Sequence, residues 1–172
     1  MDLLTDIFFS ILSNFSALLI LVFFLVSAIK VVPEYQRLVV FRLGRLVGSR
    51  GPGLVLVIPM VDRTARVDLR VVTLDVPVQE VITRDNVPIK VNAVVYFRVM
   101  DPSHSVVEVE NYIMATSQLS QTTLRSVIGR AELDEVLSDR EKINQELQQI
   151  IDERTDPWGI KVSAVEVKEL EL

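Results

Sequence analysis

A run of 23 residues without a charged side chain, close to the start of the chain, constrains the fold most. The run extends from Ile7 to Ile29 and contains neither proline nor glycine. As an α-helix it would rise roughly 34 Å, more than the roughly 30 Å of a bilayer's hydrocarbon core. A helix is the expected form, because backbone groups within lipid need internal hydrogen-bond partners. The sequence therefore predicts one membrane-spanning helix, with the apolar side chains Ile7, Phe8, Phe15, Leu18, Leu21, Phe23, Leu25 and Ile29.

The charges on either side of this segment indicate its orientation. No Lys or Arg precedes it, whereas Lys30, Arg37, Arg42, Arg45 and Arg50 follow it. By the positive-inside rule the N-terminus lies outside and the following domain in the cytoplasm. We therefore expect a single-pass protein of the cell membrane, plasma or inner. A cleaved signal peptide is the alternative, but it would begin with basic residues and have a shorter apolar core.

Charge is unevenly distributed over the rest of the chain. Residues 30–98 contain eleven basic and six acidic residues, and residues 99–172 contain seven and fifteen. A basic half next to a membrane suits anionic headgroups, although two ordinary solvated faces explain the asymmetry equally well. The expected headgroup contacts are Arg50, Arg63 and Arg66.

The pattern after the apolar segment is that of β-strands. Tyr35–Phe41 is rich in strand-forming residues, and the dense turn signal Gly48–Gly53 follows it. Apolar residues then alternate through Val67–Val71 and Leu74–Val78, and again through Ile89–Val99. The last of these runs, with its predecessor, predicts an antiparallel hairpin.

The period changes to that of helices after Asp101-Pro102. A helix is expected at Asn111–Ile128, and an amphipathic one carries Ile143, Leu147, Ile150 and Ile151. Ser138–Glu141 has the spacing of a capping box for the second helix. Asp156–Gly159 ends that helix, and Ile160–Val167 predicts a closing strand with a bulge at Ala164-Val165.

The predicted fold class is therefore α+β. A membrane anchor occupies residues 1–30, a β-rich subdomain residues 31–100, and an α/β subdomain residues 101–172.

Residue types that support catalysis are scarce. The chain has no cysteine and a single histidine, His104, and it contains no zinc-protease motif and no phosphate-binding loop. We expect no catalytic residue, no metal site and no cofactor. A tethered hydrolase that uses Ser103 and His104 remains the enzymatic alternative. Nucleic acid is not an expected partner, because the basic residues lack interleaved aromatic side chains.

The uncharged run Leu54–Ile58, closed by Pro59, allows two interpretations. It is either a strand buried in the domain or an apolar loop that dips into the near leaflet. In the second interpretation the membrane-dipping residues are Leu54, Val55, Leu56, Val57 and Ile58.

Four motifs in order resemble the stomatin family. They are Gly51-Pro-Gly-Leu with Ile58-Pro59, Thr122–Gly129, Glu132–Arg140, and Trp158–Val162 with Val165–Lys168. Stomatins and slipins belong to the stomatin/prohibitin/flotillin superfamily, also called SPFH or band 7, and the resemblance extends from about Val31 to Leu172.

The resemblance implies an SPFH fold and a membrane scaffold without enzymatic activity of its own. Such scaffolds bind lipids, assemble with copies of themselves into rings or cages, organise microdomains and regulate membrane proteins. The alternative is an accessory subunit or substrate of a membrane protease or an NfeD-type partner, or a channel regulator. The resemblance favours the leaflet-dipping interpretation of Leu54–Ile58. Expected contacts between protomers are Thr122, Arg125, Arg130, Asp134 and Arg140. The family normally continues beyond the position of Leu172 into a coiled-coil helix, which this sequence does not include.

Overall fold

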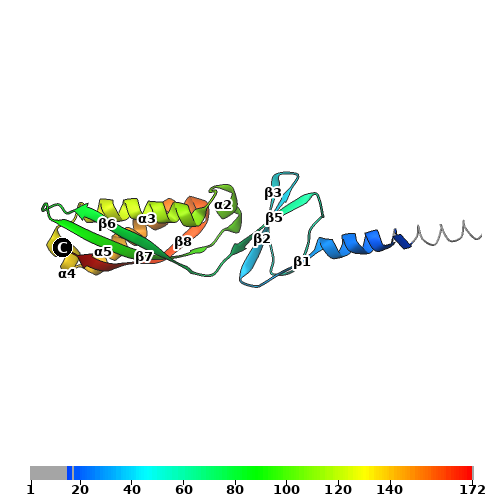
Figure 1. Ribbon diagram of the computed structural model, residues 1–172, viewed down its shortest axis with the longest axis horizontal. Helices are drawn as coiled ribbons and strands as arrows, with labels where there is room; N and C mark the ends of the chain where they lie inside the picture. Colours follow the sequence, from blue (N-terminus) through cyan, green and yellow to red (C-terminus); the bar gives the residue numbers. More distant parts are fainter. Residues whose placement is uncertain (1–14, 17, 172) are drawn as a thin grey trace, which may run out of the picture. The chain divides into compact units, whose positions relative to one another are not determined.

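Residues 18–28 are helical, and the apolar side chains from Leu18 to Val26 are exposed, up to 75% for Phe23 (Figure 1). The structure is a computed structural model that describes residues 15–16 and 18–171. Within these residues, no helix has the length and apolar content needed to cross a bilayer. Two residues of the predicted membrane-spanning set, Ile7 and Phe8, lie outside the described part. Ile29 is the first residue of a strand, so the predicted helix extended too far at this end.

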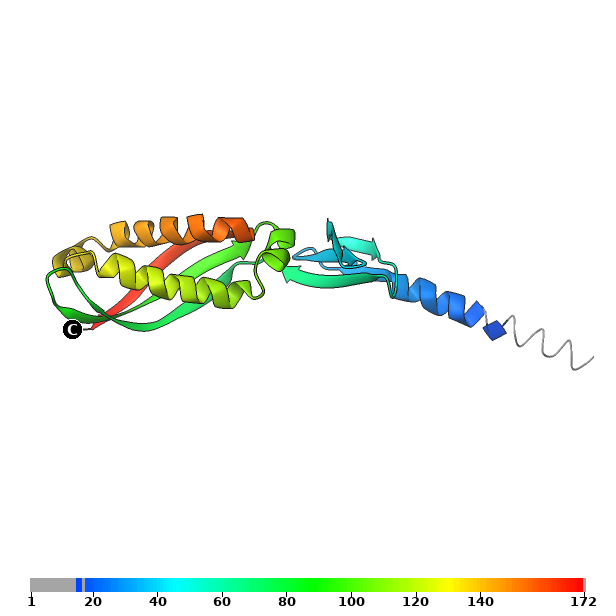
Figure 2. The same ribbon diagram turned by 90° about the horizontal axis from the view of Figure 1, so that it is seen from above.

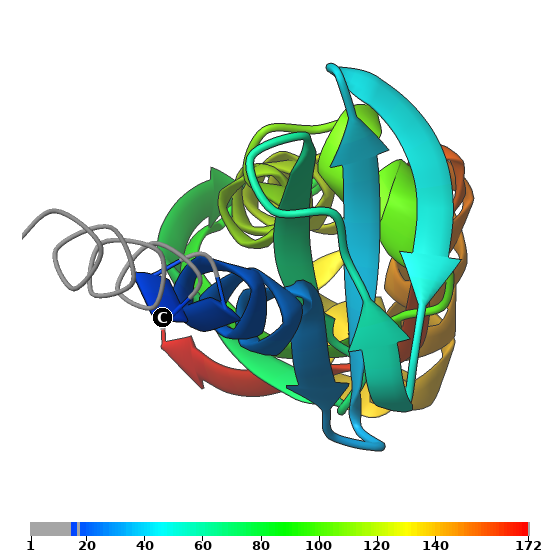
Figure 3. The same cartoon turned by 90° about the vertical axis from the view of Figure 1, so that its right-hand side faces the viewer.

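The chain divides into two units, Met1–Arg66 and Val67–Leu172. The strands of the first part are β1 (Ile29–Val32), β2 (Gln36–Arg42), β3 (Arg45–Arg50), β4 (Gly53–Leu56) and β5 (Asp62–Asp68), the last of which crosses the boundary. They form a β1–β4 pair and a sheet in the order β3-β2-β5. Figure 3 shows the helix running directly into β1. The core of this unit consists of Val32, Leu38, Val40, Val55 and Val57.

The second unit contains a three-stranded antiparallel sheet covered by helices. Its strands are β6 (Val72–Ile82), β7 (Pro88–Val99) and β8 (Ile160–Glu171), in the order β6-β7-β8. The helices are α2 (Pro102–Val107), α3 (Tyr112–Ile128), α4 (Leu133–Ser138) and α5 (Arg140–Thr155), and the short 3-10 helix η1 (Asp156–Trp158) follows. Figures 1 and 2 show α3 and α5 side by side on one face of the sheet.

Alternate side chains of β7 form part of the core of the second unit. Val91, Val95 and Phe97 of β7 point to the helices and are at most 1% exposed. Leu124 of α3 and Leu147 of α5 pack in the same cluster. The amphipathic pattern of α5 is confirmed, because Ile143, Leu147 and Ile151 are buried.

Side-chain and backbone contacts define the helix ends. Asn111 Oδ1 accepts a hydrogen bond from Met114 N over 3.1 Å, so α3 begins where the sequence predicts. Gly159 ends η1 with φ of +70°, where an added Cβ would lie 2.5 Å from the carbonyl oxygen of Asp101.

The predicted capping box at Ser138–Glu141 is wrong. Ser138 is the last residue of α4, and its hydroxyl donates to the Asp134 carbonyl over 2.6 Å. Asp139, between the two helices, makes no capping hydrogen bond with its side chain. The two helices nearly abut, so the Ser138 hydroxyl serves the end of α4 rather than the start of α5.

The strand predictions hold with local corrections. The β6–β7 hairpin is confirmed, and β8 has a register shift where Tyr96 pairs with Ala164 and Phe97 with Val162. The extra residue is Ser163, one position before the predicted slip. Gly48–Arg50 belong to β3 rather than to a turn, and β5 ends before Leu69. The division into two subdomains at residue 100 stays a prediction.

Candidate membrane-contact surface

The β1–β4 pair presents one apolar face whose four side chains are at least half exposed. Ile29 lies opposite Leu56, and Val31 lies opposite Leu54. These four side chains are 50%, 69%, 66% and 78% exposed, respectively. Residues two apart in a strand share a face, so the register makes them one continuous patch, the hairpin face.

The opposite side of the same two strands faces the protein core. Val32 and Val55 are at most 5% exposed, and Lys30 Nζ donates to Thr64 Oγ1 over 3.0 Å. Val57 is also buried, whereas Ile58 is 43% exposed. The prediction that all of Leu54–Ile58 is available to a leaflet is corrected for Val55 and Val57, because alternation turns them inward.

Two turns of this unit carry exposed apolar side chains that the sequence analysis missed. Leu43 is 83% exposed and Met60 is 99% exposed. Leu43 N donates to Val61 O over 3.3 Å, which brings the two turns together. Both residues have positive φ, 49° and 68°, a conformation that bulky side chains rarely adopt. A bulky apolar residue beside Gly44 or Pro59, within a turn, is the sequence signal that could have found them.

The turn that carries Met60 is held by a bidentate ion pair. Arg42 Nε and Nη2 donate to the Asp62 carboxylate over 2.8 and 3.0 Å, and Ile58 N donates to Asp62 Oδ2 over 3.0 Å. The Asp62 side chain is fully covered. The hydrogen bonds from Arg42 and then from Ile58 N lower the pKa of Asp62 from 3.8 to about 2. Asp62 is therefore an ionised anchor that fixes the Ile58–Asp62 turn.

The predicted headgroup-binding arginines are all exposed but do not form one cluster on a single strand face. Arg50 ends β3, while Arg63 and Arg66 lie three positions apart on β5. An odd separation places their side chains on opposite faces of the strand. Their role as headgroup contacts stays a prediction.

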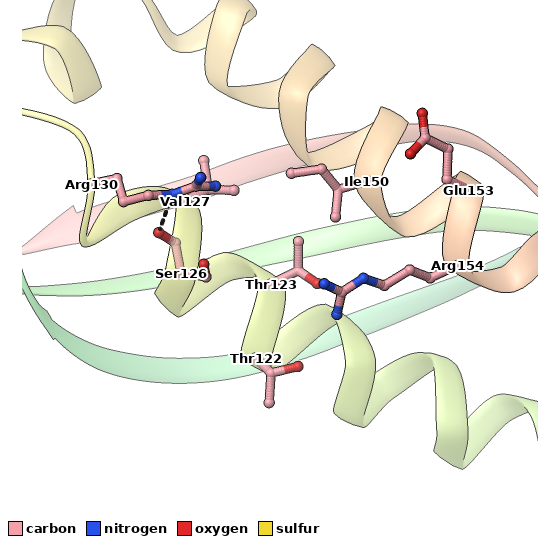
Figure 4. A pocket seen from close by; sticks show the side chains of 8 residues that line it. All are labelled: Thr122, Thr123, Ser126, Val127, Arg130, Ile150, Glu153 and Arg154. Atoms are coloured by element: carbon pink, nitrogen blue, oxygen red, sulfur yellow. Dashed lines mark hydrogen bonds between the residues drawn. The ribbon is translucent and has the colours of Figure 1, made fainter.

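The predicted protomer contacts lie in the second unit and are exposed. Thr122 and Arg130 line a cavity of about 450 Å³ between α3 and α5, together with Arg154 (Figure 4). Arg125 is on α3 outside this cavity, Asp134 is on α4, and Arg140 begins α5.

The single histidine, His104, contacts the carboxylate of nearby Asp101. His104 Nδ1 lies 2.8 Å from Asp101 Oδ2, and the Asp101 carboxylate also accepts from Ser103 N and His104 N at the start of α2. The hydrogen bond to Asp101 raises the pKa of His104. Among the described residues, no three His, Asp or Glu side chains are grouped to hold a metal ion.

A model of the SPFH domain / Band 7 family matches residues 30–172. The chain belongs to this SPFH family.

Its relatives within the SPFH family include stomatins of distant organisms. A stomatin homologue of Pyrococcus horikoshii is 67% identical over 155 residues, which is 90% of this chain and 58% of the relative. Stomatin-1 of Caenorhabditis elegans is 52% identical over 145 residues, 84% of this chain and 44% of the relative. Mechanosensory protein 2 of the same animal is 48% identical over 167 residues, 94% of this chain and 35% of the relative. The chain is thus a stomatin-like SPFH protein, and it spans somewhat more than half the length of the archaeal relative.

Proposed function

We propose that this chain is a membrane-attached scaffold of the stomatin type. It binds lipid through the N-terminal apolar segment and the hairpin face, associates with copies of itself, and thereby organises membrane microdomains and regulates the membrane proteins within them. The N-terminus lies outside the cell and the SPFH domain lies on the cytoplasmic side.

The observation that carries the proposal is the continuity of exposed apolar surface in the first unit. The helical residues 18–28 end at Ala28, whose carbonyl accepts a hydrogen bond from Val57 N over 2.8 Å. The hairpin face begins at the next residue, Ile29. An apolar helix and an apolar strand pair thus follow one another directly in the chain.

The free energy favours a bilayer as the partner of this surface. Fully burying a Leu or Ile side chain contributes about 1.5–3 kcal/mol. Four partly exposed aliphatic side chains therefore have several kcal/mol to gain from an apolar environment. Contiguous exposed apolar patches typically mark contact sites for membranes or proteins.

Site-specific spin labelling tests the proposal directly. The chain lacks cysteine, so each introduced cysteine is the unique labelling site. Leu54→Cys and Leu56→Cys variants of the full chain would be labelled and reconstituted into liposomes with anionic lipid. In power-saturation EPR we expect both labels to be more accessible to oxygen than to a water-soluble nickel complex, as lipid-buried sites are.

A matched control is Val78→Cys in β6, which is 58% exposed but belongs to the second unit. Its label should be more accessible to the nickel complex than to oxygen. If positions 54 and 56 match the control, the hairpin face does not enter the bilayer and the proposed mode of attachment is wrong.

Copurification distinguishes the scaffold from the accessory subunit. If the reconstituted chain copurifies only as a one-to-one complex with another membrane protein, the accessory-subunit alternative replaces the scaffold.

A further inference from the structure

The cavity between α3 and α5 in the second unit is lined by two arginines, Arg130 and Arg154. Arg130 enters it from the end of α3, and Arg154 enters it from the last turn of α5. Arg130 Nε donates to Ser126 O over 3.1 Å, and its Nη2 forms an ion pair with Glu146 at 3.4 Å. Within the described part of the chain, Arg154 has no ion-pair partner, although residues 99–172 are rich in acids.

The acidic residue that lines the same cavity does not neutralise Arg154. Glu153 Oε1 accepts a hydrogen bond from Gln149 over 3.2 Å. Figure 4 shows the Glu153 carboxylate pointing away from the two guanidinium groups, and the Arg154 side chain extending from α5 toward α3. Arginine forks suit carboxylates, and a cavity with this charge attracts an anionic side chain.

The cavity also has an apolar floor. Val127 is 2% exposed, and Ile150 packs partly buried beside the core. The occupant that matches this lining has an apolar side chain flanked by carboxylates. A volume of about 450 Å³ accommodates several side chains.

Helix α4 of this same chain presents such a group. Leu137 is 47% exposed, and Asp134 lies three residues earlier on the same face of the helix. The neighbouring acids are already engaged, Glu132 with Arg84 and Glu135 with Lys142. Asp134, by contrast, makes no ion pair or side-chain hydrogen bond among the described residues.

Asp134 and Arg154 cannot meet within one molecule, although Glu135 of α4 borders Val127 and Arg130 at the other end of the cavity. The Glu135–Lys142 ion pair of 2.5 Å ties α4 to the first turn of α5, whereas Arg154 lies in the last turn. Arg154 lies 14 positions after Arg140, which corresponds to about 21 Å of helix. A second copy of the chain is needed to bring Asp134 to Arg154.

We propose that α4 of one protomer docks into the α3–α5 cavity of the next, with Leu137 over Val127 and Ile150 and with Asp134 paired to Arg154. This inference rests on the self-assembly in the proposed function and names its contact. The contact is head-to-tail, because different surfaces meet on the two copies. Such a contact repeats from copy to copy and closes into a ring when the rotation permits.

Charge reversal tests the pairing. Full-length Asp134→Arg, Arg154→Asp and the double variant would be reconstituted into nanodiscs and into detergent, and their particle masses measured by mass photometry. Each single reversal should weaken the contact at least about tenfold and shift the population to small species. The double variant should restore the wild-type mass, because it exchanges the two charges.

The control is Arg98→Asp, an exposed change of the same charge on the sheet face away from the helices. Far-UV circular dichroism verifies that each variant is folded. If the wild type forms large particles and the single reversals leave them intact, or the double variant fails to restore them, the docking is refuted while the scaffold stands. If the wild type itself is monomeric in both environments, the self-assembly is refuted and the docking with it.

Discussion

Asp62 shows how one side chain keeps an apolar turn in place. Its carboxylate receives two hydrogen bonds from Arg42 and one from the backbone of Ile58, and its side chain is fully covered. The turn that it holds presents Met60 at 99% exposure. Positive φ is unfavourable for a bulky side chain, so without the Asp62 hydrogen bonds the turn would relax to other backbone conformations.

Replacing Asp62 by asparagine should destabilise the first unit and loosen this turn. The folded carboxylate has a pKa of about 2 against an ordinary 3.8, so its contribution to folding is complete above about pH 4 and is lost as the pH falls through 2. The stability difference between the wild type and Asp62→Asn, measured by urea unfolding, should therefore be constant from pH 5 to 7 and shrink below pH 4. Amide exchange at Val61 and Asp62 should be faster in the variant.

Asp75→Asn is the control for this prediction. Asp75 pairs with Lys168 at the exposed surface, where ion pairs contribute little. A pH-independent difference for Asp62→Asn, or an equal loss in the Asp75 variant, would contradict the role assigned to Asp62.

At the scale of elements, α3 combines a well-packed face with buried hydroxyl groups. Ser120 donates to the Thr116 carbonyl over 2.7 Å, but the hydroxyl groups of Thr116 and Thr123 have no hydrogen-bond partner among the residues that the structure describes. Thr116 is fully buried. A buried hydroxyl without a partner is unfavourable, because it has lost its hydrogen bonds to water.

Thr116→Val, which keeps the shape of the side chain, should therefore stabilise the second unit by about 1 kcal/mol. Ser120→Ala should instead destabilise it by about 1 kcal/mol, because it removes a hydrogen bond that is made. Chemical denaturation of the two variants beside the wild type gives both signs. A loss of stability in Thr116→Val would mean that its hydroxyl does have a partner.

The elements that could be predicted from the sequence are those long enough to show a period. The strands β6 and β7 and the helices α3 and α5 repeat their apolar spacing several times. The short elements β1, β3, α2 and α4 have at most six residues each, too few for a period to emerge. The misread capping box has the same origin, since its motif is local and its outcome depends on where α4 ends.

The candidate surface could be predicted only in part for a related reason. In Leu54–Ile58 every residue is apolar, so the sequence does not distinguish the side chains that face the core from those that face outward. The pairing of β4 with β1 decides this, and that pairing joins segments more than twenty residues apart. The α3–α5 cavity depends likewise on two helices that are separate in the sequence.

At the scale of the whole molecule, the division near residue 66 is a division of hydrophobic cores. The second unit contains a core drawn from β6, β7, β8, α3 and α5, and the described part of the first unit has a smaller core of five residues. A unit with its own core can in general fold by itself.

We therefore expect residues 67–172, expressed alone, to fold cooperatively. Thermal unfolding followed by the fluorescence of Trp158, the chain's single tryptophan, should give one sigmoidal transition. The full chain observed with the same probe should give a transition at a similar temperature. A fragment without a transition would show that the second unit needs residues before 67.

The alternation in β4 has a consequence for how such a protein can diverge. Val55 of β4 and Val57 just after it contribute to folding, whereas Leu54 and Leu56 contribute nothing to the core. If the hairpin face binds lipid as proposed, exchanges at the outward positions alter affinity for a given lipid composition while the folded population stays constant. Under this proposal, adjacent residues of one short strand are subject to separate selective pressures, and lipid preference changes one side chain at a time.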